Sequence, residues 1–140
     1  MTTSVILRLA AILAAIQGMA HGALFISAKP RAGAAEEAVV AAMKTVRVLP
    51  GGLGYWDYYF GYGLIAAAVC LVEAVLFWQL ARIAVVQQAL VRPTLVLFVV
   101  ANVAHAALLV RYFKFPVPIA FDLAIAALLS WAFVVSRAGR

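Results

Sequence analysis

Four long apolar segments follow one another along the chain, and each is interrupted by only a few polar residues. A helix needs about 20 apolar residues to cross the hydrocarbon core of a bilayer, and inside lipid only helices or closed barrels satisfy every backbone hydrogen bond. The pattern therefore predicts an all-α membrane protein, a single domain over residues 1–140 with four antiparallel transmembrane helices and both termini on one side. The predicted spans are about 4–28, 58–82, 93–111 and 117–136.

The first apolar segment has a competing interpretation as a secretory signal peptide, because small residues flank His21 as they would a cleavage site. Its apolar stretch is longer than the core of a typical signal peptide, which favours a membrane span. In the second connection, Pro93 is expected to start the third helix after a short turn over residues 83–92.

The connection between the first two spans carries a different pattern, with acids at its start and bases near its end. That order suits the dipole of a helix, and the apolar residues recur at helical spacing. They are Val39, Val40, Met43 and Val46. We predict a short amphipathic helix over about residues 34–48 that lies on the membrane or caps the bundle. The segment Pro50–Gly54 then turns the chain back toward the bilayer.

Composition agrees with a membrane protein, since 68% of the residues are hydrophobic and 11% are charged, whereas about a quarter are charged in a soluble domain. The single cysteine, Cys70, excludes an intrachain disulfide and a thiolate cluster. The net charge of +6 is spread over helix ends and loops, so the sequence predicts a lipid bilayer as partner and no nucleic acid. Basic residues are nearly balanced between the two faces, and the lid-like first loop favours cytoplasmic termini.

Seven polar residues within or beside the apolar segments are the candidate ligand-binding residues, because such groups are costly in hydrocarbon and should face a partner or a cavity. They are Gln17, His21, Asp57, Glu73, Asn102, His105 and Asp122. The helical rise per residue places three of them, His21, His105 and Asp122, in one layer. The second layer contains Glu73 and Asn102, with Gln17 close to it. With Asp57 at the mouth, the sequence predicts a buried polar column that opens toward the long loop.

Such a column is suited to a small hydrophobic or amphipathic ligand, because a few convergent polar groups would orient it. Were the protein an enzyme, Glu73 and a histidine would act as acid and base; whether any reaction is catalysed stays open. A second interpretation is haem b with His21 and His105 as axial ligands, or a metal site that adds Asp122.

A third interpretation is an accessory subunit of a larger membrane complex, or a homo-oligomer, in which the polar network is purely structural. It predicts a flat surface of small residues that faces lipid and packs on other subunits. The first span offers such a set in Ala10, Ala11, Ala14 and Ala15.

The aromatic segment YWDYYFGYGL, Tyr55–Leu64, leads the second span after the amphipathic loop and its glycine turn. With the Gly-, Ala- and His-containing first helix, it resembles a group of small uncharacterised bacterial four-helix membrane proteins, and the layout is similar to that of DoxX-like proteins. The resemblance implies a multi-pass protein of the bacterial cytoplasmic membrane and no assigned reaction. The layout is also similar to sterol-isomerase-type bundles, but no motif matches residue by residue, so no catalytic role is carried over.

Overall fold

The computed structural model describes residues 1–27 and 33–138 of the chain, and this part is mostly helical. The helices are α1 (Thr3–Ser27), α2 (Ala34–Thr45), α3 (Tyr55–Val86), α4 (Gln88–Leu108) and α5 (Pro116–Ala138). Within the described residues, four helices are long and apolar enough to cross a membrane: α1, α3, α4 with its extension to Phe113, and α5. The predicted all-α class is confirmed. Ala28, the predicted last residue of the first span, lies outside the described residues.

The chain forms two compact units. Unit 1 combines Met1–Gln17 with Cys70–Arg140, and unit 2 is Gly18–Val69. Helices α1 and α3 contribute residues to both units. The arrangement of the whole chain as a single domain stays a prediction.

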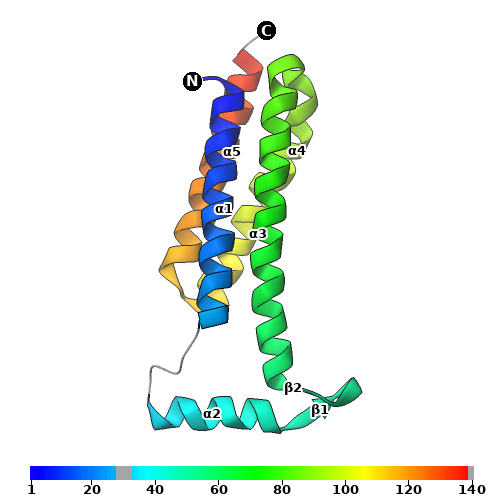
Figure 1. Ribbon diagram of the computed structural model, residues 1–140. Coiled ribbons are helices and arrows are strands. Elements are labelled where there is room, and N and C mark those ends of the chain that lie inside the picture. Colours follow the sequence, from blue (N-terminus) through cyan, green and yellow to red (C-terminus); the bar gives the residue numbers. More distant parts are fainter. Residues whose placement is uncertain (28–32, 139–140) are drawn as a thin grey trace. The chain divides into compact units, whose positions relative to one another are not determined.

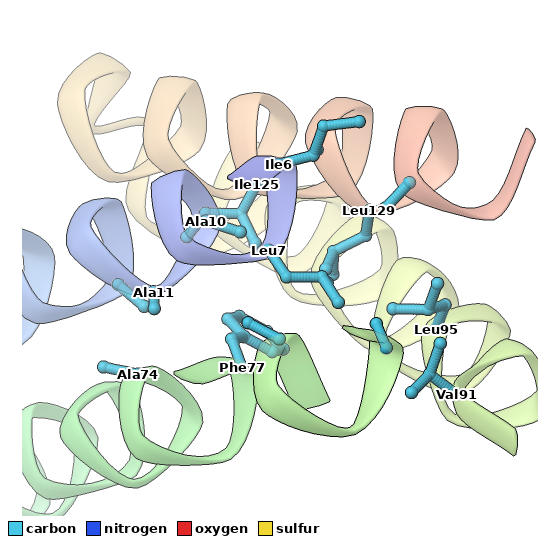
Figure 2. Close-up of a cluster of buried hydrophobic side chains, with 14 residues drawn as sticks. Ile6, Leu7, Ala10, Ala11, Ala74, Phe77, Val91, Leu95, Ile125 and Leu129 are labelled. Carbon is cyan, nitrogen blue, oxygen red and sulfur yellow. The ribbon is translucent and has the colours of Figure 1, made fainter. Parts of the chain in front are cut away.

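Unit 1 is held together by an apolar core to which α1, α3, α4 and α5 all contribute, as Figure 2 shows. Leu7, Phe77, Leu95 and Leu129 come from these four helices in that order, and each is 0% exposed. The ring of Phe77 meets the ring of Phe98 edge to face, with 5.0 Å between centroids. The start of α1 and the end of α5 lie at the same end of unit 1 (Figure 1). The helices of this unit are therefore stabilised by close packing of large apolar side chains between them.

Three alanines of α1 also face this core, since Ala10, Ala11 and Ala14 are at most 3% exposed and Ala15 packs partly buried against them. The expectation that these residues form a lipid-facing surface is wrong. The physical reason is their spacing, which continues the helical stripe that begins at Leu7 and so places them on the same inward face. Their short side chains let the neighbouring helices of unit 1 approach closely.

The connection between α3 and α4 is shorter than expected, because α3 continues to Val86 and α4 begins at Gln88. Two residues of the predicted turn, Ala84 and Val91, are at most 1% exposed, and the core contact favours helix over turn at both positions. Pro93 therefore lies inside α4 rather than at its start. It has no N–H to donate to the carbonyl one turn earlier, so α4 lacks one backbone hydrogen bond there.

Unit 2 contains α2 and a short hairpin between α2 and α3. Strand β1 (Arg47–Leu49) pairs antiparallel with β2 (Leu53–Gly54), and the turn Pro50–Gly52 joins them. Gly51 and Gly52 have φ of 77° and 73°, a conformation that favours glycine. The sequence predicted the turn but not the strands. Helix α2 ends at Thr45 instead of residue 48, because the chain becomes extended where the strand pairing begins.

Candidate functional site

Asp122 is the most buried acid in the described part of the chain, and its carboxylate connects three helices of unit 1. The residue is 2% exposed in the second turn of α5. Gln17 of α1 donates a hydrogen bond from Nε2 to Oδ1 over 3.0 Å. Nδ1 of His105 on α4 lies 2.9 Å from Oδ2. Because Asp122 falls on the same face of α5 as the core residue Leu129, two turns on, the carboxylate points to the interior of unit 1.

His105 joins this buried acid to a more open environment, because its side chain is 52% exposed. It lies seven residues after Phe98, and residues at that spacing share one face of a helix. The ring of Phe98 packs on Phe77 of α3, so this face of α4 is the one directed at α3. With Nδ1 directed at Asp122, the other ring nitrogen, Nε2, is left for a different partner.

Glu73 of α3 completes a cluster of ionisable groups. It lies one turn before Phe77, is half-buried, and interacts electrostatically with Asp122 and His105. Within the part of the chain that the structure describes, Glu73 makes no hydrogen bond and no ion pair. We call Glu73, His105 and Asp122 the acid–histidine cluster. Two acids and one base from three helices thus lie close enough to interact electrostatically.

The amide side chains of Asn102 and Gln17 differ in whether they bond within their own helix or to another helix. Asn102 is 4% exposed, and its Nδ2 donates to the carbonyl of Phe98 on its own helix over 2.9 Å. Gln17 was predicted to lie close to the layer of Glu73 and Asn102, but it bonds to Asp122 of the other layer. Counting residues along a helix locates Cα atoms, whereas the long glutamine side chain reaches about one helical turn further.

The two remaining predicted residues, His21 and Asp57, belong to unit 2. The ring of His21 lies 4.9 Å from that of Phe25, which in turn lies 5.2 Å from the ring of Tyr59. Asp57, in the first turn of α3, accepts hydrogen bonds at Oδ2 from the backbone N–H of Gly54 over 2.8 Å and from Nη1 of Arg47 over 2.7 Å. Asp57 thus has a structural role at the start of α3, between helix and hairpin.

Sequence reasoning missed the partner of Asp57, because Arg47 was treated only as a cation of the loop. The available signal was a base and an acid on opposite sides of a glycine-rich turn, a spacing that a hairpin brings together. It also missed the contact between Lys44 and Trp56, in which Nζ lies 4.6 Å from the ring centroid. Both contacts depend on the strand pairing that the sequence did not reveal.

Unit 1 also carries two shallow apolar grooves, and neither is lined by a residue of the acid–histidine cluster. One, of about 230 Å³, lies between α4 and α5; the other, of about 290 Å³, lies between α1 and α5. The first is lined by Val96, Val99, Val100, Ser130, Phe133 and Val134. Among the described residues, no three His, Cys, Asp or Glu side chains are grouped so that they could hold a metal ion.

Comparison with family models, with curated proteins and with solved structures finds no match to this chain. The chemistry of the acid–histidine cluster is therefore the main guide to function. A histidine held at Nδ1 by a carboxylate can accept or donate a hydrogen bond at Nε2. Glu73 interacts electrostatically with His105, so the cluster offers two polar side chains beside the buried carboxylate of Asp122.

Proposed function

We propose that this chain is a multi-pass membrane protein that binds a small hydrophobic or amphipathic molecule at the acid–histidine cluster. The observation that carries the proposal is the contrast within one contact: Asp122 is 3% exposed at its side chain, whereas His105, 2.9 Å away, is 52% exposed. An ionisable side chain at the depth of a spanning helix and open to its surroundings is costly unless a partner meets it. A ligand with a hydrogen-bonding group supplies that partner.

The surroundings of His105 suit the two parts of an amphipathic molecule. A hydroxyl or carbonyl group of the ligand would bond to Nε2 of His105. Glu73, which interacts electrostatically with His105, would be the second polar residue for the ligand. The apolar part would lie along the lipid-facing side of α4, where Leu108, one turn from His105, is 54% exposed. Few polar groups and much apolar surface are typical of small-molecule sites in membrane bundles.

The alternative is an accessory subunit with a purely structural network. In its favour, Gln17, His105 and Asp122 already connect three helices without any ligand. Against it, the alanines of α1 are buried and offer no flat surface to another subunit. The resemblance to small bacterial membrane proteins supports a setting in the bacterial cytoplasmic membrane, with cytoplasmic termini as the proposed orientation.

The test is native mass spectrometry of the protein released from a mild detergent, with an absorption spectrum of the same sample. The wild-type protein should retain an added mass, and His105→Ala and Glu73→Gln should each lose most of it. Gln79→Ala, an exposed position of α3 outside the cluster, should retain it. A bare monomer, or equal retention by His105→Ala, would contradict the proposal. A Soret band would replace it with haem b, and larger complexes would support the accessory role.

A further inference from the structure

Helix α2 has an exposed apolar stripe that none of the described residues of unit 2 covers. The helix contains no buried residue. Four small apolar residues on one side of it are exposed, and they recur at the spacing of one helical face. They are Ala35, Ala38, Val39 and Ala42, with Val39 59% exposed. The exposed Glu37 and Lys44 fall on other sides of the helix, so the stripe is free of charge.

The chain on both sides of α2 keeps it close to a membrane surface. Helix α1 ends at Ser27 and α3 begins at Tyr55, and both are long and apolar enough to span. A chain that leaves a bilayer through one helix and returns through the next stays on a single face. The seven Cα-to-Cα steps from Ser27 to Ala34 extend to at most about 25 Å. Helix α2 therefore cannot move far from that face.

Contacts within unit 2 hold the end of α2 level with the first turn of α3. Nζ of Lys44 lies over the ring of Trp56, 4.6 Å from its centroid. The ion pair between Arg47 and Asp57 closes over 2.7 Å just beyond the helix. At Gly54 there is no room for a side chain, since a Cβ atom would lie 2.9 Å from the carbonyl oxygen of Met43. In Figure 1 the end of α2 lies close to the hairpin and the start of α3.

The first turns of α3 indicate the depth in the membrane at which α2 is held. Four tyrosines there, Tyr55, Tyr58, Tyr59 and Tyr62, are each more than half exposed. Tyrosine and tryptophan concentrate where the hydrocarbon of a bilayer meets its headgroups, because their rings are apolar and their tips are polar. A helix held beside these four tyrosines lies at the depth of the lipid headgroups. At that depth an uncharged stripe of small residues can be buried in lipid.

We infer that α2 is an interfacial helix that lies in the plane of the membrane, with the stripe around Val39 buried at the boundary between the lipid headgroups and the acyl chains. Its partner is the bilayer itself. Because the stripe is mostly alanine, the helix inserts shallowly, and its two flanking spans supply most of the attachment. This inference concerns unit 2 and is independent of ligand binding at the acid–histidine cluster.

The test measures depth with spin labels at two positions of α2. Val39→Cys and Ala41→Cys are made separately in a Cys70→Ala background, and both sites are exposed. The labelled proteins are reconstituted in phosphatidylcholine vesicles, and collisions with oxygen and with a water-soluble nickel chelate are measured by electron paramagnetic resonance. The label at 39 should favour oxygen and the label at 41 should favour nickel, with a several-fold difference in the ratio.

Two outcomes would overturn the inference. Equal and high access of nickel at both positions would place α2 in water, away from the lipid. Protection of position 39 from both reagents would mean that protein covers the stripe, either another subunit or a second copy of this chain. Size-exclusion chromatography of each labelled variant, compared with the wild type, verifies that the background substitution leaves the fold intact.

Discussion

The two units each contain an aspartate in a short polar contact, and the two contacts differ in environment rather than in length. In unit 1, Asp122 lies 2.9 Å from His105 and its side chain is 3% exposed. In unit 2, Asp57 lies 2.7 Å from Arg47, and the two side chains are 40% and 53% exposed. Removing a partner of a buried ion leaves a charge that water cannot reach, whereas an exposed ion is hydrated again at once. Contact distance alone therefore says little about the importance of either pair.

The two units also differ in where their polar side chains lie. Unit 1 places the carboxylate of Asp122 inside a core of helices, where Gln17 and His105 contact it. Unit 2 places its charges at the edge, where they connect helix α2, the hairpin and the start of α3. Burying an ionisable side chain in unit 1 costs free energy, so such a residue is a candidate for a functional role. The exposed charges of unit 2 carry no such cost.

The largest expected effect comes from Asp122→Ala, which removes the acceptor shared by Gln17 and His105. We expect the free energy of unfolding to fall by up to about 3 kcal/mol, because two polar side chains lose a buried partner. Thermal unfolding in detergent measures it. Ser130→Ala on the same helix is the matched control, since its hydroxyl bonds only to the carbonyl of Ala126 one turn earlier. Equal losses for the two variants would show that the buried carboxylate has no special role.

A smaller effect is expected from Gly54→Ala in unit 2. The added Cβ atom would lie 2.9 Å from a backbone oxygen of Met43 and 3.1 Å from that of Val46, so α2 or the hairpin must shift. We expect a loss of about 1 to 3 kcal/mol, read from thermal unfolding. Gly61→Ala is the matched control, because a Cβ there meets no atom within 4 Å and α3 gains helix propensity. If both substitutions stabilise the protein, the hairpin does not pack on α2 as described.

The smallest effect is expected from Arg47→Gln, which removes the exposed ion pair but leaves the bond from Gly54 to Asp57. The change in unfolding free energy should be below about 1 kcal/mol. Because salt screens exposed charges, the difference from the wild type should shrink further in concentrated salt. A loss as large as that of Asp122→Ala, insensitive to salt, would erase the contrast between the two units.

The sequence identified the ionisable residues of unit 1 but not how they pair. The cost of placing polar groups in lipid selected Glu73, His105 and Asp122 as part of a larger set of seven polar residues. Their depth along each helix was accessible from the rise per residue. The bond from Gln17 to Asp122, and the turn of Asn102 back onto its own helix, were not, because they depend on side-chain reach and on the rotation of each helix about its axis. His21 with haem, and the column that links it to His105, stay predictions.

By itself, the sequence determined the helical class, the four apolar segments and the amphipathic helix between the first two, because hydrophobic length and period are local properties of the chain. The tertiary structure decided which face of each helix is inward. In the structure, alanines of α1 belong to the core, and Ala84 and Val91 are helical where a turn was expected. Strand pairing places Arg47 beside Asp57. These outcomes depend on contacts between residues distant in sequence, and no pattern within a single segment specifies them.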